Sequence, residues 1–400
     1  MDISKLMGLD KLDSILSRIE KRPLHLFANQ CLKERNRRLT CDACQKGCPA
    51  GAIDLSAGVE VDFSRCVDCG ICVNICPTGV FESRLTEDYF LSRIQNCLRS
   101  GRIVGFSCSK QSAAAGGNKS AVEVEVPCLG RVSEAMLVGA AAFGAETIWL
   151  NTSVCSECDA REGLTLARQT VRGVDKLLEA WGRRVRFVLT AKLPVDRASS
   201  GAVEDEGGAY NRRELLAKLK REALVAGLGL AQGRIDKVAG AFEPAANRHF
   251  DSRLPRKREL LLRLTKKLGE PAQDSLHTED LSLYGLACDA GRCNLCGNCA
   301  VFCPTEALRI DKGGDAVRLS FNVSRCLGCD LCVEVCSPRA LSIDTQIHLS
   351  HVLKEADRSL VDMTYFECAK CKQPFPAAEK KPLCDFCRVR EEKLNDDSWS

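Results

Sequence analysis

Apolar residues recur at helical spacing along the first thirty residues of the chain. We therefore expect an amphipathic helix over residues 1–30, packed on its own chain rather than on a partner. Its apolar positions are Ile3, Leu6, Leu9, Leu12, Ile15, Leu16 and Ile19. No apolar run approaches the ~20 residues that a membrane-spanning helix needs, and the longest candidate is Met136–Ala145.

Short β-branched runs alternate with helical stretches between residues 97 and 195. Strands are predicted at 102–106, 122–126, 147–150 and 185–189. Helices are predicted between them, including 133–143 and 161–181. This alternation predicts a small parallel α/β domain.

Residues 196–285 read as a helical linker. They open with a Gly/Ser/Asp-rich stretch, Ser199 to Gly208, and continue with two basic helical stretches, Arg212–Leu228 and Pro255–Leu268. A charge run of this kind is typical of a solvent-exposed helix face, so we expect these charges to be solvated.

Cysteine usage changes the picture most, because the 400 residues include 26 cysteines. The segment RCVDCGICVNICPTGVF (65–81) returns as RCLGCDLCVEVCSPRAL (325–341). This repeat, interrupted by a different domain, indicates modular construction. The predicted segments are 1–30, 31–96, 97–195, 196–285, 286–347 and 348–400.

Residues of both charges are interspersed along the chain, and the net charge is +4. This pattern gives no indication of nucleic-acid binding.

Two runs in the second half follow the C-x2-C-x2-C-x3-C spacing that holds a pair of [4Fe–4S] clusters. Three thiolates of one run cover three corners of a cluster, and the fourth cysteine serves the cluster of the other run. The first cluster is therefore assigned to Cys293, Cys296, Cys299 and Cys336, and the second to Cys326, Cys329, Cys332 and Cys303. Ser337 stands where the pattern has proline.

The first half repeats this pattern with one irregular run. Arg38 occupies the position of the first ligand, and the nearest upstream cysteine is Cys31. We expect a loop insertion to have moved the ligand back to Cys31; a [3Fe–4S] cluster with Cys31 free is the alternative. The assigned sets are Cys31, Cys41, Cys44 and Cys76, and Cys66, Cys69, Cys72 and Cys48.

Both modules resemble bacterial-type two-cluster ferredoxins, on the strength of these runs and their CP endings. The resemblance implies a βαββαβ fold around two clusters. Strands are visible at 51–55 and 59–63, joined by Ser56-Ala57-Gly58.

Four cysteines of the predicted α/β domain stand at or beyond strand ends: Cys108, Cys128, Cys155 and Cys158. The carboxyl ends of parallel strands meet at one edge, so we expect a four-thiolate metal site there. The segments IVGFSC and VPCLGRV and the following C-x-x-C resemble the delta subunit of methyl-viologen-reducing hydrogenases. The resemblance implies a [2Fe–2S] cluster on these four residues. The alternative is a thioredoxin-like dithiol at Cys155 and Cys158.

Cys368, Cys371, Cys384 and Cys387 have the spacing of a zinc ribbon, so we expect Zn²⁺ in a structural site, with a rubredoxin-like iron site as the alternative. Cys97 is interpreted as a buried apolar residue, and Cys288 as a spare thiol or substitute ligand.

The predicted fold class is therefore multidomain α+β and α/β, with two ferredoxin-like modules, one parallel α/β domain, a helical linker and a zinc ribbon. The predicted function is a non-catalytic electron-transfer subunit that links a catalytic subunit to a second redox partner. The resemblance implies a hydrogenase, formate dehydrogenase, molybdopterin enzyme or heterodisulfide-reductase-like partner. A ferredoxin-fed disulfide reductase using Cys155 and Cys158 is the alternative. With these cysteines and no visible export signal, we expect a cytoplasmic location.

Overall fold

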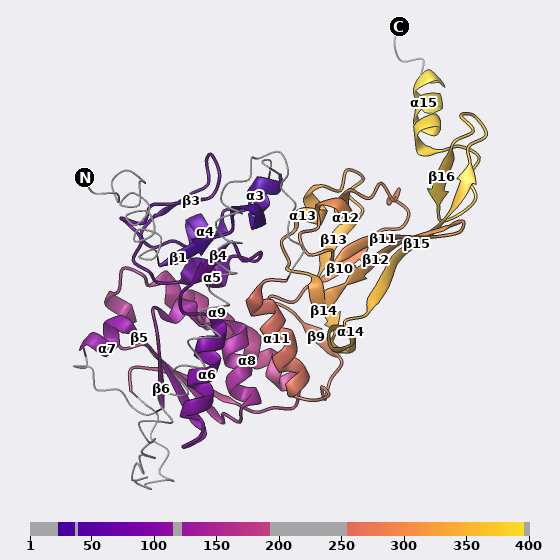
Figure 1. Cartoon of the computed structure of the whole chain (residues 1–400). Helices are drawn as coiled ribbons and strands as arrows, with labels where there is room; N and C mark the ends of the chain where they lie inside the picture. Colours follow the sequence, from indigo (N-terminus) through magenta and orange to yellow (C-terminus); the bar gives the residue numbers. More distant parts are fainter. Residues whose placement is uncertain (1–22, 37–38, 115–121, 193–253, 396–400) are drawn as a thin grey trace, which may run out of the picture. The chain divides into compact units, whose positions relative to one another are not determined.

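The computed structural model describes residues 23–36, 39–114, 122–192 and 254–395 (Figure 1). Most of the helix expected over residues 1–30 lies outside these ranges, as do the stretches 199–208 and 212–228. Leu24–Leu26 form strand β1 and not part of a helix, because they pair antiparallel with β4 (Phe81–Ser83). None of the helices in the described ranges is long and apolar enough to cross a bilayer.

Two regions of the chain have the same order of elements, βαββαβ. The first consists of β1, α4 (Ala43–Lys46), β2 (Ile53–Asp54), β3 (Glu60–Val61), α5 (Ile71–Ile75) and β4. The second consists of β10 (Gly285–Cys288), α12 (Asn298–Phe302), β11 (Leu308–Gly313), β12 (Ala316–Asn322), α13 (Leu331–Glu334) and β13 (Leu341–Asp344). In each region the outer strands pair antiparallel, as do the two middle strands. The first region thus begins at β1, upstream of the predicted boundary at residue 31.

Short elements precede the first cysteine run, namely η1 (Ala28–Gln30) and α3 (Leu32–Arg35). Helix α6 (Glu87–Cys97) follows β4 and leads into the central domain. Cys97 is 7% exposed and belongs to the apolar core, as expected for a small buried residue.

The central domain contains the predicted parallel sheet, with strand order β6-β5-β7-β8. The strands are β5 (Ile103–Cys108), β6 (Glu123–Val126), β7 (Thr147–Asn151) and β8 (Arg186–Thr190), and all neighbours run parallel. The connecting elements are α7 (Ser109–Ala114), η2 (Leu129–Arg131), α8 (Glu134–Ala142), η3 (Cys155–Glu157) and α9 (Glu162–Ala180). The four strands predicted from β-branched runs are confirmed, with ends shifted by one or two residues.

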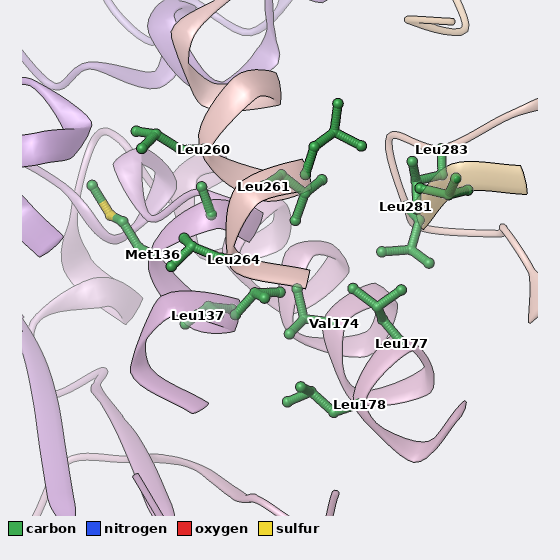
Figure 2. Packing of buried hydrophobic residues seen from close by; sticks show 14 of the residues in the cluster. Met136, Leu137, Val174, Leu177, Leu178, Leu260, Leu261, Leu264, Leu281 and Leu283 are labelled. Carbon is green, nitrogen blue, oxygen red and sulfur yellow. The ribbon is translucent and has the colours of Figure 1, made fainter. Parts of the chain in front are cut away.

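Helix α11 (Arg256–Lys267) packs its apolar residues into the core of the central domain. Figure 2 shows Leu260, Leu261 and Leu264 of α11 beside Met136 and Leu137 of α8. The same apolar cluster continues into the second βαββαβ region. The expectation that charges of this helix are solvated is wrong at its first turn, because Arg258 is 3% exposed.

The first turn of α11 is buried because its cations meet backbone carbonyls. Lys257 Nζ donates to the carbonyls of Val73, Asn74 and Cys76, at 3.3, 2.6 and 2.6 Å. Arg258 Nη2 donates to the carbonyls of Ser282 and Cys326, the latter at 2.6 Å. Carbonyl acceptors offset much of the cost of desolvating a cation.

The tail shares a sheet with the second βαββαβ region. Strand β15 (Asp357–Glu367) pairs with β12 along most of its length and with β16 (Pro374–Ala377) near its end. A further pair forms between β9 (Ser275–His277) and β14 (Gln346–His348). The remaining helical elements are η5 (Val323–Arg325), α14 (Leu349–Lys354) and α15 (Asp385–Asn395).

A buried ion pair joins α6 to the central domain. Arg131 Nη1 lies 2.8 Å from Glu87 Oε1, and the two side chains are 1% and 8% exposed. The same guanidinium lies over the ring of Phe90, 5.3 Å from its centroid. A charge this far from water depends on its partner.

We predict that Glu87→Gln lowers the free energy of unfolding by about 3–5 kcal/mol, because it leaves the Arg131 charge buried and uncompensated. Glu146→Gln is the matched control: Glu146 pairs with Arg102 at the surface, where an ion pair contributes less than about 1 kcal/mol. Anaerobic urea denaturation of the full chain measures both. Equal free energies of unfolding for the two variants would show that the buried ion pair contributes no more to stability than the surface pair.

Candidate metal centres

Three of the four cysteine runs share one backbone turn around their middle cysteine. Left-handed residues stand directly before and after Cys69, Cys296 and Cys329. They are Asp68 and Gly70, Leu295 and Gly297, and Gly328 and Asp330, with φ between 50° and 80°. A residue other than glycine is held in this conformation only by its surroundings. The surrounding structure of each of the three runs therefore maintains this turn.

The fourth cysteine of every run accepts the same hydrogen bond. The backbone N–H four residues further along donates to its thiol sulfur in all four runs. The bonds are Ala52 to Cys48 at 3.3 Å, Val80 to Cys76 at 3.4 Å, Ala307 to Cys303 at 3.2 Å and Ala340 to Cys336 at 3.2 Å. The irregular run keeps this bond at Cys48. The serine after Cys336 leaves it unchanged.

In the first region, the thiols of Cys31, Cys41 and Cys44 lie near that of Cys76. Burial raises the pKa of these three thiols, and the neighbouring charge of Cys76 raises all three further. For Cys44 the pKa rises to about 12. Cys31 is 8% exposed and stands at the end of η1. The structure thus places Cys31 near the other three thiols, and its role as a ligand stays a prediction.

The other four thiols of this region form a second group. Burial raises the pKa of Cys72, and the charges of Cys69, Cys66 and Cys48 raise it further. The Cys69 pKa rises to about 11 by burial, with additional contributions from Cys128, Cys48 and Cys66. Cys128 belongs to the central domain, so this group lies near that domain.

The second region repeats the arrangement. Burial raises the pKa of Cys299 to about 12, and the charges of Cys293, Cys296 and Cys336 add to it. Burial likewise raises the pKa of Cys332, with contributions from Cys326, Cys329, Cys303 and, from the other group, Cys299.

Cys288 is a fifth thiol beside the group of Cys293, Cys296, Cys299 and Cys336. It is the last residue of β10, directly paired with Leu341. Burial raises its pKa to about 12, and Cys293, Cys299 and Cys336 act on it electrostatically. The prediction that it is a spare thiol or substitute ligand stays open.

The four cysteines of the central domain meet at one sheet edge. Cys108 is the last residue of β5, Cys128 follows β6 after Pro127, and Cys155 begins η3 beyond β7. Burial raises the pKa of Cys128 to about 11, and Cys108, Cys155 and Cys158 raise it further. Lys110 Nζ lies 3.6 Å from Cys158 Sγ. The convergence predicted from strand order is therefore present in the fold.

The C-terminal cysteines form the tightest group. One sulfur from each of Cys368, Cys371, Cys384 and Cys387 lies within 4.8 Å of the others. The Cys384 N–H donates to Cys368 Sγ at 3.4 Å, and the backbone N–H groups of Cys371 and Cys384 lower the Cys368 pKa to about 6. Backbone donors that stabilise a thiolate favour metal binding.

The sequence patterns do not predict that basic side chains lie next to the thiol groups. Lys257 contacts the carbonyl of Cys76, and Arg258 that of Cys326. One signal was available: Arg256, Lys257 and Arg258 stand together at a helix start. Cations there oppose the helix dipole, so they need partners of their own.

Comparison with known proteins matches these regions to two families. A model described as 4Fe-4S dicluster domain matches residues 37–80 and 292–340. A model described as methyl-viologen-reducing hydrogenase, delta subunit, matches residues 103–199.

One curated relative is a subunit of the ion-translocating oxidoreductase complex of Methanosarcina acetivorans. It is 47% identical over 45 residues, which is 11% of this chain and 17% of the relative. The chain therefore spans less than a fifth of that protein. Taken with the two family matches, the chain carries two 4Fe–4S dicluster regions on either side of a domain of the methyl-viologen-reducing hydrogenase delta-subunit type.

Proposed function

We propose that the chain is a multi-cluster iron–sulfur electron-transfer subunit of a larger oxidoreductase complex. The observation that carries the proposal is the gathering of sixteen ferredoxin-type cysteines into four groups of four, with each fourth cysteine crossing to the other run of its region. Each group offers only sulfur donors, the donor set of a [4Fe–4S] cluster.

Four groups would hold the four cubane clusters. They are Cys31, Cys41, Cys44 and Cys76; Cys48, Cys66, Cys69 and Cys72; Cys293, Cys296, Cys299 and Cys336; and Cys303, Cys326, Cys329 and Cys332. Such a cluster supplies one-electron chemistry at a potential set by charge, hydrogen bonds to sulfur and exposure. The protein's contribution to that potential includes the amide donors to Cys48, Cys76, Cys303 and Cys336.

We propose a [2Fe–2S] cluster on Cys108, Cys128, Cys155 and Cys158. The family match over residues 103–199 and the shared sheet edge support it. A thioredoxin-like dithiol gains less support, because Cys155 starts a 3₁₀ turn and helix α9 begins only at Glu162. Burial also raises the Cys155 pKa to about 11, which works against a reactive thiolate.

For the tail we propose a structural Zn²⁺ site on Cys368, Cys371, Cys384 and Cys387. Their spacing and close approach suit a closed tetrahedral thiolate site.

The proposed partners are a catalytic oxidoreductase subunit and a second redox protein. The names of the matched family and of the relative, a hydrogenase subunit and a subunit of an oxidoreductase complex, both support membership of a complex. A reducing cytoplasm, which keeps thiols available for metals, is part of this proposal.

We predict about 18 irons and about one zinc per chain after anaerobic purification, from four cubanes, the central site and the tail. Elemental analysis and the visible absorption spectrum measure this. A protein that contains zinc but no iron would contradict the ferredoxin assignment.

Cys31→Ser should convert or destroy one cluster of the first region and leave the second region intact, because Cys31 lies in the group around Cys76. Iron content and electron paramagnetic resonance (EPR) spectra measure the loss. Cys97→Ser is the matched control, since this buried cysteine lies on α6 and should retain every cluster signal. Unchanged iron in Cys31→Ser would point to the three-cysteine alternative.

We further predict that the isolated chain carries electrons without turning over a substrate. It should accept electrons from dithionite and pass them to dyes, because clusters ligated entirely by cysteine leave no open coordination position. Anaerobic assays with hydrogen, formate and a panel of disulfides test this. Turnover of a disulfide by the chain alone would instead support the Cys155/Cys158 dithiol.

A further inference from the structure

The loop that displaces Cys31 packs against the second dicluster region. Leu32 and Leu39 form a small apolar cluster with Leu331, and all three are at most 4% exposed. Cys41 and Cys329 pack against the same cluster. Two candidate ligands from different regions therefore share one apolar contact. We call the contact of Leu32, Leu39 and Leu331 the bridge.

Polar contacts reinforce the bridge on both sides. Thr40 Oγ1 donates to Glu334 Oε1 at 3.1 Å. The half-buried Arg35 guanidinium lies within electrostatic range of the thiols of Cys303 and Cys329. A cation carried by the first region thus acts electrostatically on thiols of the second.

At its other side the first region contacts the central domain. Asn74 Nδ2 donates to the carbonyls of Gly130 and Val132, both at 3.0 Å. A Cβ added at Gly130 would lie 2.8 Å from a side-chain carbon of Ile71, and one at Gly163 would lie 3.3 Å from another carbon of the same side chain. Both positions need glycine for this close approach. The contact brings Ile71, the residue before Cys72, against Gly130, which stands two residues after Cys128.

From these contacts we infer a single linear order for the redox sites, resting on the proposed electron-transfer function. The central site comes first, followed by the group of Cys48, the group of Cys44, the group of Cys329 and the group of Cys296. The bridge is the crossing between the two dicluster regions. Electron tunnelling falls steeply with distance, so neighbours in this order exchange electrons and the two end sites face outside partners.

The order makes distinct predictions for an inner and an end site. The group of Cys44 has two neighbours, whereas the group of Cys296 has one. Reduced clusters that are neighbours broaden each other's EPR signals through spin–spin interaction. Removing an inner cluster should therefore sharpen two signals, and removing the end cluster only one.

The experiment compares Cys44→Ser with Cys296→Ser in the fully reduced, iron-loaded full chain. We expect two EPR signals to sharpen in Cys44→Ser. One of them is identified as the signal of the Cys329 group because it disappears in the separate variant Cys329→Ser. Cys296→Ser should sharpen that one signal alone. If Cys44→Ser sharpens only a signal of its own region, the bridge is not the crossing and the order is overturned.

A charge variant tests whether the first region approaches the Cys329 group at the bridge, without removing any ligand. Arg35→Gln should shift the midpoint potential of the cluster marked by Cys329→Ser to more negative values, because a nearby cation stabilises the reduced cluster. Arg35→Lys should restore it. Arg318→Gln is the control, since Arg318 pairs with Asp362 on the exposed side of the same region. Full iron content with no shift in Arg35→Gln would contradict the bridge, whereas a parent protein without iron would contradict the proposed function itself.

Discussion

The arrangement depends on one geometric constraint: a tight loop can offer only three thiols to a cubic cluster. The fourth thiol must come from elsewhere, and here the fourth cysteine of each run lies with the thiols of the other run. Cys76 lies with Cys31, Cys41 and Cys44, while Cys48 lies with the run that contains Cys76. This exchange puts thiols from both halves of a region into each group. The helices and strands around these groups are short, and bound clusters would add to the stability of such small elements.

Buried cations are the second organising feature. Arg131, Lys257 and Arg258 sit where elements from different parts of the chain meet, and each finds anionic or carbonyl partners. Cysteines that bind a cluster as thiolates would concentrate negative charge, so cations at their margins would lower the electrostatic cost of bringing the groups close. The same residues that join the regions thereby adjust the electrostatic field around the thiols.

The sequence predicted features governed by local pattern. The four parallel strands follow from β-branched runs, and the grouping of cysteines follows from spacing, although the ligand roles remain predictions. Long-range contacts were not predictable in this way. The pairing of Leu24–Leu26 with β4, the burial of Arg258 and the contact of Leu39 with Leu331 all join residues distant in sequence. No local period encodes such a pairing, so the helical period of residues 1–30 does not reveal the strand at Leu24–Leu26, and the basic start of α11 does not reveal that Arg258 is buried.

Strand β15 links the C-terminal cysteines to the second dicluster region within one sheet. Its first part pairs with β12, and its last residues pair with β16 just before Cys368. A metal that binds the folded tail more tightly than the unfolded chain shifts the folding equilibrium toward the paired strand by mass action. A metal bound by the tail would thus act as a thermodynamic clamp. Its removal would weaken a sheet whose far strand, β11, follows directly after the Cys303 run.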